Sequence, residues 1–225
     1  MAYHAGGALH GIRRRDTVMD SGTFSIAPPP NLLLVVSGSS GAGKDAVIDR
    51  MKELHFPVAH VVTATTRQQR PTEVNGVHYH FLSVARFHEM VERGEMLEWA
   101  NVYDHLYGVP RFAVLDALQT GKDVVVKVDV QGAATIRRTV PSAVLLFIRP
   151  PSMAELEQRL RSRSSESDAE IAVRLGKAAG EYSQLPLFDY VLTNFAGRLD
   201  EVVDQVRAII VAEKLRVHPR SIEIG

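Results

Sequence analysis

The 225-residue chain contains no cysteine, which excludes a disulfide framework and any metal site built from thiolates. Its 26 lysine and arginine residues balance 26 aspartate and glutamate residues. The charge balance gives no support for bulk attraction to nucleic acid or to an anionic membrane, and neither is expected as a partner. No apolar run approaches the length of a membrane span. The absence of cysteine fits a reducing cytosol, so a cytoplasmic protein is expected, whether monomer or dimer.

Residues 1–30 differ in composition from the rest of the chain. Three arginines at 13–15 and three prolines at 28–30 surround few apolar residues, which predicts a disordered N-terminal extension. The basic cluster is not followed by the apolar stretch of a signal peptide. Met19 is an alternative start of translation. Residues 31–214 are expected to form the folded domain, and residues 215–225 a C-terminal tail.

The most informative stretch begins with an apolar run at 32–36 and ends in a glycine-rich turn. Gly38, Gly43 and Lys44 match the motif G-x-x-x-x-G-K-[ST], while Asp45 occupies its last position. Such a loop directs backbone N–H groups at phosphate oxygens at the positive end of a helix. The alternative is a glycine-rich turn with a chance lysine. Because strand, spacing and helix agree, we expect a nucleoside polyphosphate to contact Gly38, Ser39, Ser40, Gly41, Ala42, Gly43, Lys44 and Asp45.

The periodicity predicts an α/β fold. Apolar runs at 32–36, 124–128 and 143–148 are typical of strands covered on both faces, as in a parallel sheet. Helical patterns at 46–54, 110–121, 132–138, 152–160 and 199–215 alternate with them and favour helices on both sides of the sheet. Ser152 and Glu155 are spaced as a capping box. The segment 63–110 contains several turn signals and short strands, which indicate a small mixed lobe.

That segment also carries candidate phosphate ligands. Arg67 and Arg70 are three residues apart, and Tyr79 and Tyr107 follow. Guanidinium groups bind phosphate oxygens in a bidentate manner, so these residues could form a second phosphate site. The alternative is a solvated polar loop, which the two arginines alone would favour.

Glu98 lies in an apolar setting, Met96-Leu97-Glu98-Trp99-Ala100. A half-buried glutamate requires hydrogen-bond donors, and guanine offers N1–H and N2–H2 side by side, whereas adenine has no such pair. A structural glutamate paired with a nearby arginine is the alternative. The residue alone does not decide between them.

Taken in order, the motifs closely resemble the guanylate kinase family. They are the phosphate loop, Thr-Thr-Arg-x-x-Arg at 65–70, Glu-x-x-Gly-x-x-Tyr at 73–79, Leu-Glu-Trp-Ala at 97–100, Tyr-Gly at 107–108, Val-Asp-Val-Gln-Gly at 128–132 and Phe-Ile-x-Pro-Pro-Ser at 147–152. The resemblance covers residues 32–214. It implies a P-loop nucleoside monophosphate kinase fold, with a core (31–62, 111–158 and 186–214), a GMP-binding lobe (63–110) and a helical lid (159–185).

The resemblance implies the reaction ATP + GMP → ADP + GDP, with Mg²⁺ as cofactor. It assigns the GMP phosphate to Arg67, Arg70, Tyr79 and Tyr107, and the guanine side to Thr63 and Glu98. It places Lys44 at the β- and γ-phosphates and Asn194 near the adenine. Lid arginines that close on the transferring phosphoryl group are Arg159, Arg163 and Arg174, although a charged, solvated helix is the alternative for that segment.

Four positions depart from the family pattern. Asp45 replaces the hydroxyl residue that helps to orient Mg²⁺, and a carboxylate is itself a suitable magnesium ligand. Val109 stands where a hydroxyl residue often contacts the base, and Phe195-Ala196 replaces an acidic pair. Lys127 stands where an aspartate is usual, and its charge could complement that of Asp45.

Two other functions remain open from the sequence. One is a guanylate-kinase-like module that binds a phosphorylated partner without catalysis, although such modules lack an intact phosphate loop. The other is a kinase of the same fold that acts on a different small phosphate acceptor. The departures from the family pattern at Val109 and Lys127 are compatible with it.

Overall fold

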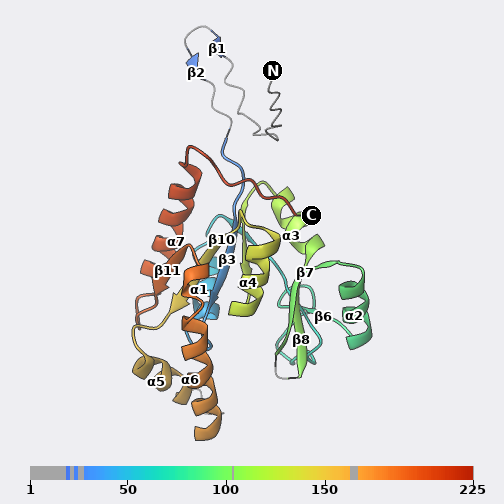
Figure 1. Ribbon diagram of the computed structural model, residues 1–225, viewed down its shortest axis with the longest axis vertical. Coiled ribbons are helices and arrows are strands. Elements are labelled where there is room, and N and C mark those ends of the chain that lie inside the picture. Colours follow the sequence, from blue (N-terminus) through green and yellow to red (C-terminus); the bar gives the residue numbers. More distant parts are fainter. Residues whose placement is uncertain (1–18, 21–22, 25–27, 103, 163–166, 225) are drawn as a thin grey trace, which may run out of the picture.

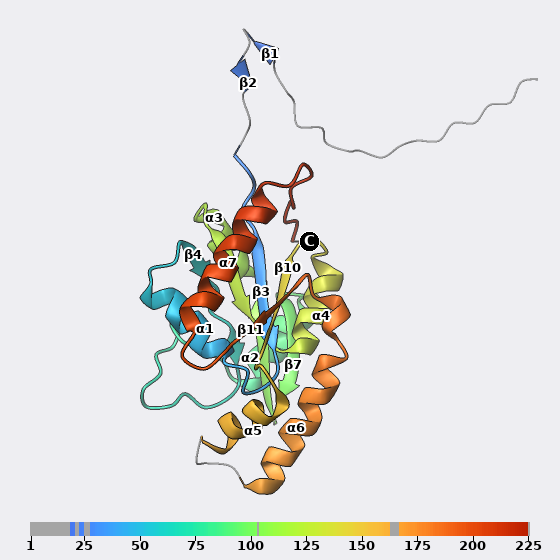
Figure 2. The same ribbon diagram turned by 90° about the vertical axis from the view of Figure 1, so that its left-hand side faces the viewer.

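Figures 1 and 2 present the computed structural model of the chain, which describes residues 19–20, 23–24, 28–102, 104–162 and 167–224. Near the N-terminus, β1 (Met19–Asp20) and β2 (Thr23–Phe24) form an antiparallel pair. The disorder expected for residues 1–30 stays a prediction. Most of that extension lies outside the described residues.

A parallel sheet of five strands forms the centre of the fold. The strand order is β11 (Tyr190–Thr193), β10 (Val144–Arg149), β3 (Leu33–Gly38), β9 (Asp123–Lys127) and β4 (Val58–His60). All neighbouring strands are parallel. The three apolar runs form the three middle strands, whose side chains are almost all buried. The predicted α/β fold with a parallel central sheet is confirmed.

Helices cover both faces of this sheet because successive strand residues point to opposite sides. On one face α1 (Lys44–Glu53) and α7 (Leu199–Lys214) share a core with Leu34 and Val36. On the other face α3 (Arg111–Gln119) and α4 (Val130–Thr139) share a core with Leu33 and Val35. Figure 2 shows α1 and α7 side by side. The phosphate loop therefore leaves a strand that is fixed from both sides.

A second sheet of four strands lies beside α4 (Figure 1). Its order is β6 (His80–Phe81), β5 (Ala64–Thr65), β8 (His105–Pro110) and β7 (Met96–Val102), and α2 (Val84–Glu92) packs against it. β5 and β6 are parallel, whereas β8 is antiparallel to both β5 and β7. Val84 begins α2 but is 56% exposed. Phe87 and Met90 supply the buried face of that helix instead.

Two helices after β10, α5 (Met153–Arg161) and α6 (Asp168–Tyr182), form a pair with its own small apolar core. The short helix η1 (Leu185–Leu187) leads from α6 towards β11. Ser152 accepts a hydrogen bond from the backbone of Glu155, but the reciprocal half of the expected capping box is missing because Glu155 pairs with Arg159. A complete capping box starts α6 instead, at Ser167 and Glu170. Within the described ranges, every helix is too short or too polar to cross a bilayer.

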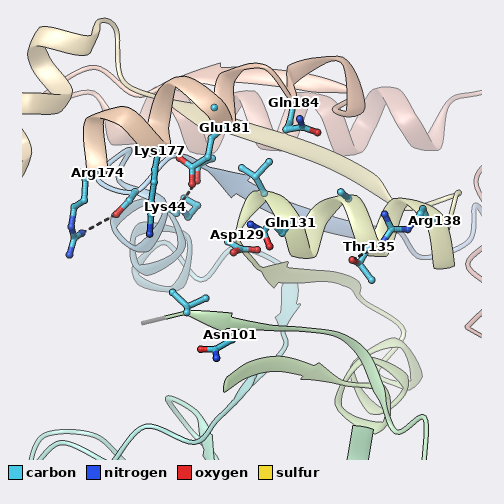
Figure 3. A pocket seen from close by; sticks show the side chains of 16 residues that line it. Lys44, Asn101, Asp129, Gln131, Thr135, Arg138, Arg174, Lys177, Glu181 and Gln184 are labelled. Carbon is cyan, nitrogen blue, oxygen red and sulfur yellow. Dashed lines mark hydrogen bonds between the residues drawn. The ribbon is translucent and has the colours of Figure 1, made fainter. Parts of the chain in front are cut away.

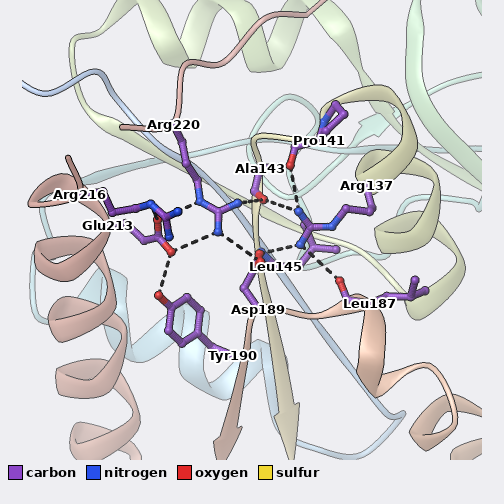
Figure 4. Close-up of polar contacts among 10 residues, drawn as sticks. All are labelled: Arg137, Pro141, Ala143, Leu145, Leu187, Asp189, Tyr190, Glu213, Arg216 and Arg220. Carbon is purple, nitrogen blue, oxygen red and sulfur yellow. Dashed lines mark hydrogen bonds and ion pairs between the residues drawn. The ribbon is translucent and has the colours of Figure 1, made fainter. Parts of the chain in front are cut away.

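The C-terminal residues are attached to the core by a polar network (Figure 4). Glu213, at the end of α7, is 1% exposed. It accepts hydrogen bonds from Nε of Arg220 at 2.9 Å and from the Tyr190 hydroxyl at 2.8 Å. Arg220 also contacts Asp189, which in turn pairs with Arg137 of α4 at 2.6 Å. The network joins the tail, α7 and the start of β11, and Ile222 and Ile224 pack against the core beside it.

Arg220→Met is expected to lower the free energy of unfolding by about 2–4 kcal/mol, because it leaves a buried carboxylate with only part of its compensation. Urea denaturation followed by circular dichroism measures the change. Arg216→Met is the matched control: this arginine contacts Glu213 at 3.6 Å from an exposed position, so its loss is expected to cost about 1 kcal/mol or less. Equal losses in the two variants would contradict this account of the network.

Candidate functional site

The loop between β3 and α1 has the backbone that its glycines predict. Gly38, Gly41 and Gly43 have φ values of 139°, 86° and 92°, which favour glycine. A Cβ on Gly38 would lie 2.0 Å from the carbonyl oxygen of Ile148 in β10. The chain therefore passes in direct contact with β10 before α1 begins. The N-terminus of α1 provides the unpaired N–H groups that bind anions.

Asn194 and Arg159 support this loop from outside. Asn194 is 4% exposed and donates from Nδ2 to the carbonyl oxygen of Ala42 at 3.0 Å. Arg159 donates to the carbonyl oxygen of Asn194 at 2.7 Å and forms an ion pair with Glu155. A Cβ on Gly43 would lie 2.3 Å from Nδ2 of Asn194. Asn194 thus holds the loop backbone in place, a role that the sequence did not reveal. Its predicted position beside the adenine of ATP stays a prediction.

Besides Arg159, two further predicted catalytic cations reach the loop. Nζ of Lys44 donates to the carbonyl oxygens of Gly38 at 2.6 Å and Ser39 at 3.0 Å. Burial lowers the pKa of Lys44, and the nearby carboxylates of Glu181 and Asp45 oppose the shift. Arg174 of α6 donates to the Ser40 hydroxyl at 3.0 Å. The fourth predicted cation, Arg163, lies outside the described residues.

A large cavity of about 870 Å³ opens between α6, α4 and the end of β7 (Figure 3). Lys177 and Glu181 project into it from α6, and Asp129 and Gln131 project from the start of α4. Lys44 and Arg174 line the end of the cavity nearest the phosphate loop. The charged lining suits a polar ligand that carries phosphate.

A smaller pocket of about 200 Å³ shares Lys44, Val102 and Asp129 with the large cavity. Its lining brings together four residues predicted to bind the acceptor nucleotide, from four separate parts of the chain: Thr63, Tyr79, Glu98 and Tyr107. The rings of Tyr79 and Tyr107 meet edge to face, with centroids 6.1 Å apart. Because Lys44 lines both cavities, ligands in the two would lie on either side of it beside the phosphate loop.

The two predicted phosphate-binding arginines differ in their placement. Arg67 forms a bidentate ion pair with Glu73, with distances of 2.7 and 3.0 Å, and its guanidinium carbon lies 5.6 Å from the centre of the Tyr79 ring. The Arg67 pair lowers the pKa of Glu73 to about 2. Arg70 is exposed, and its backbone N–H donates to Glu73. Neither arginine lines the cavities, although Arg67 contacts a tyrosine that does.

Glu98 is 6% exposed on β7 and faces the start of α4. A Cβ on Gly132 would lie 2.6 Å from Oε2 of Glu98, so only glycine permits this approach. Burial raises the pKa of Glu98 to about 8, and the charge of Asp129 adds to the shift. Among the described residues no basic side chain offsets that shift, which removes the alternative of a structural glutamate–arginine pair. Glu98 is therefore a buried acid that lines the smaller pocket and can accept hydrogen bonds from a ligand there.

The charge complementarity expected of Asp45 and Lys127 is confirmed, because the two side chains form an ion pair. Lys127 ends β9 and lines the smaller pocket, whereas Asp45 lies in the first turn of α1. Val109, another departure from the family pattern, is fully buried and provides no acceptor. The described residues contain no cluster of three or more candidate metal ligands. Asp45 places one carboxylate, a ligand type that Mg²⁺ accepts, in the first turn of α1.

The sequence did not lead us to assign Asp129, Gly132 and Glu181 to the site. Asp129 lines both cavities and caps α4 by accepting from the Gly132 backbone N–H at 2.7 Å. Glu181 faces Lys44 and has a buried oxygen without a hydrogen-bond partner. The motif Val-Asp-Val-Gln-Gly was the available signal for Asp129 and Gly132, because two polar residues, Asp129 and Gln131, follow a buried strand there. Glu181 has no comparable local signal.

The phosphate loop follows the middle strand of a parallel sheet, at the carboxyl ends of the strands, and a pocket for a second ligand adjoins it. This arrangement defines the class of P-loop nucleotide kinases. The family model described as guanylate kinase matches residues 31–213. The chain therefore belongs to the guanylate kinase family.

Individual relatives agree. A guanylate kinase 2 of chloroplasts and mitochondria from Oryza sativa subsp. japonica is 44% identical over 90% of this chain and 73% of its own length. A guanylate kinase from Caldanaerobacter subterraneus subsp. tengcongensis is also 44% identical, over 83% of this chain and 89% of its own. The crystal structure of guanylate kinase from Anaplasma phagocytophilum superposes with a TM-score of 0.66 at 29% identity, covering 84% of this chain and 89% of the other.

Because folding raises the pKa of Glu98 from an ordinary value near 4.5 to about 8, its stabilising contribution is full below pH 4.5 and disappears as the pH rises through 8. Relative to Glu98→Gln, the wild type is therefore expected to lose roughly 2–4 kcal/mol of unfolding free energy between pH 5 and pH 9. Urea denaturation at both pH values measures this difference. Glu95→Gln, at an exposed surface position, is the control, and a pH-independent difference for Glu98→Gln would contradict the raised pKa.

Proposed function

We propose that this protein is a guanylate kinase that transfers the γ-phosphoryl group of ATP to GMP, giving ADP and GDP. The single observation that carries the proposal is that Lys44 lines both cavities. On one side of this lysine is a phosphate loop, and on the other is a pocket whose buried acid, Glu98, matches the donor edge of guanine. Membership of the guanylate kinase family supports both assignments.

The acceptor nucleotide is proposed to occupy the smaller pocket. Glu98 accepts from N1–H and N2–H2 of guanine and ionises when it does so, because two donors stabilise its charged form. Thr63 adds a hydroxyl on the guanine side. Tyr79 and Tyr107 bind the acceptor phosphate. Arg67 and Arg70 join them when the loop that carries them closes, which for Arg67 requires sharing or releasing Glu73.

The donor nucleotide is proposed to lie along the phosphate loop, from Gly38 to Asp45, with Asn194 near its adenine. Phosphoryl transfer requires positioning and cationic charge more than covalent catalysis. Lys44 leaves the carbonyl oxygens that it contacts now and binds the β- and γ-phosphates, while Arg159, Arg163 and Arg174 act on the group in transfer. A lid that closes over this site excludes water, which would otherwise hydrolyse ATP.

Mg²⁺, bound together with ATP, would supply positive charge that offsets the charge of the phosphates in transfer. Asp45 would hold it through a carboxylate oxygen, directly or through water. The residues of the chain bind and orient the two nucleotides around that charge.

The division of the chain into parts is also proposed. Residues 63–110 form the GMP-binding lobe, supported by a four-stranded sheet built only from that range. Residues 159–185 form the lid, supported by the separate apolar core of α5 and α6. The rest of 31–214 is the core, and the reaction is placed in the cytoplasm.

A non-catalytic module that binds a phosphorylated partner is the competing function. It would need the pocket around Tyr79 but not an ordered phosphate loop. The loop keeps the backbone that binds phosphate, because Gly38, Gly41 and Gly43 all hold positive φ values at the start of α1. This geometry favours the enzyme.

A coupled assay for ADP production with ATP and GMP, dGMP, AMP, UMP or CMP tests the proposal. We expect kcat/KM for GMP to exceed that for AMP, UMP and CMP at least ~100-fold, because a base without the donor pair leaves Glu98 unpaired. Turnover of GMP no faster than that of the other nucleotides would exclude guanylate kinase activity. Binding of GMP without turnover would favour the non-catalytic module.

Gly132→Ala tests the role of Glu98 without removing it. The added Cβ would lie 2.6 Å from Oε2 and 3.0 Å from Cδ of Glu98, so the carboxyl group must move. We expect kcat/KM for GMP to fall by about 10- to 100-fold, with KM for ATP unchanged and thermal stability unchanged or raised, since alanine favours helix by about 1 kcal/mol. Gly176→Ala, a helical glycine with open space around it, is the matched control. Unchanged GMP kinetics in Gly132→Ala would rule out guanine recognition by Glu98 in its present position.

A further inference from the structure

We propose that Lys127 binds the phosphate of the acceptor nucleotide and the phosphoryl group during transfer, and that Asp45 positions it. This proposal rests on the proposed function, because it needs an acceptor phosphate in the smaller pocket. It assigns a binding role to one departure from the family pattern and a positioning role to another.

The backbone places Lys127 at the centre of the site. It is the last residue of β9 and pairs in register with Val36 of β3, two residues before Gly38 begins the turn into the phosphate loop. The side chain is 32% exposed and lines the smaller pocket together with Lys44, Tyr79 and Tyr107. A cation at this position faces the predicted acceptor phosphate from the side of the central sheet.

Asp45 determines where the ammonium group lies. The pair joins the end of β9 to the first turn of α1, across 82 positions in the sequence. It draws the lysine towards the helix terminus at which the donor phosphates are expected. Lys127 is thereby held at the boundary between the donor and acceptor phosphate sites.

The charges around Lys127 indicate an anion as its additional ligand. Lys127 and Lys44 both line the smaller pocket, so their two positive charges face the same space. Two neighbouring ammonium groups in one half-buried pocket become favourable when a phosphate lies between them.

A purely structural role for the pair explains less. The side chain of Asp45 is 71% exposed, and ion pairs with such an exposed partner contribute little to stability. An apolar residue at the end of β9 would fill the same position without the cost of burying an ammonium group. The lysine is therefore better explained by a ligand than by the fold.

The transfer step needs no proton from Lys127. An oxygen of the GMP phosphate attacks the γ-phosphorus of ATP, the new P–O bond forms, and the bond from the γ-phosphorus to the β–γ bridging oxygen breaks. ADP leaves with that electron pair. Lys127 stays protonated throughout and follows the negative charge on the transferred group.

Calorimetric titration in EDTA, without ATP or magnesium, tests the phosphate contact directly. We expect Lys127→Met to weaken GMP binding at least tenfold while guanosine, which lacks the phosphate, binds as it does to the wild type. Lys127→Arg is expected to recover GMP affinity to within threefold of the wild type. Lys122→Met changes an exposed lysine that immediately precedes β9; it is the matched control and should bind GMP normally.

Asp45→Asn tests the positioning role in the same titration. It is expected to weaken GMP binding at least threefold in the wild-type background and to have no further effect in Lys127→Met, because the residues then act as one unit. In turnover, kcat should fall together with GMP affinity in Lys127→Met. Additive effects of the two substitutions would overturn the positioning role.

Two results would overturn the role of Lys127: unchanged GMP affinity in Lys127→Met, or equal loss of GMP and guanosine affinity, which would indicate a collapsed pocket. Lys127→Gln replaces Lys127→Met if the latter does not fold. Failure of the wild type to bind GMP would overturn the proposed function itself, so the two failures are distinguishable.

Discussion

The site depends on the close contact between the phosphate loop and the strand beside it. Gly38 lies so near the carbonyl oxygen of Ile148 that no side chain fits between them, and Gly43 approaches Asn194 in the same way. These two contacts fix both ends of the loop against β10 and against the residue that follows β11. The start of α1 is fixed as a consequence, and with it the origin of Lys44 and Asp45. A loop that could relax outward would lose the convergence of N–H groups that binds phosphate.

The chain has no net charge, yet several lysine and arginine side chains converge on this site. Carboxylates form ion pairs with some of them and fix their positions. Glu73 orients Arg67, Asp45 holds Lys127, and Glu155 pairs with Arg159. Each pair limits the freedom of a long side chain before any ligand arrives, so less entropy is lost when a phosphate binds. Glu98 is the opposite case, since burial keeps it protonated until donors reach it. The electrostatics of the site are thus organised for two anionic ligands and one polar base.

The sequence predicted the parts of this structure that local patterns determine. The apolar runs gave the parallel strands, and the spacing of Gly38, Gly43 and Lys44 gave the loop. It did not reveal that Asn194 supports the loop, because that contact joins residues 152 positions apart. Gly132 was visible in a motif, but its function appears only when β7 packs against α4 and brings Glu98 to it. The complementarity of Asp45 and Lys127 could be suspected from charge alone, whereas their place between the two cavities required the fold.

The central claim is that donor and acceptor phosphates meet end to end at Lys44. The most direct measurement is the affinity of a single molecule that spans both cavities, adenosine joined to guanosine through a chain of five phosphates. The account predicts binding of one molecule per chain, at least ~100-fold tighter than either ATP or GMP alone because the second half binds without a new loss of translational freedom. It also predicts displacement by either nucleotide. Binding no tighter than that of the better single nucleotide would contradict a shared site.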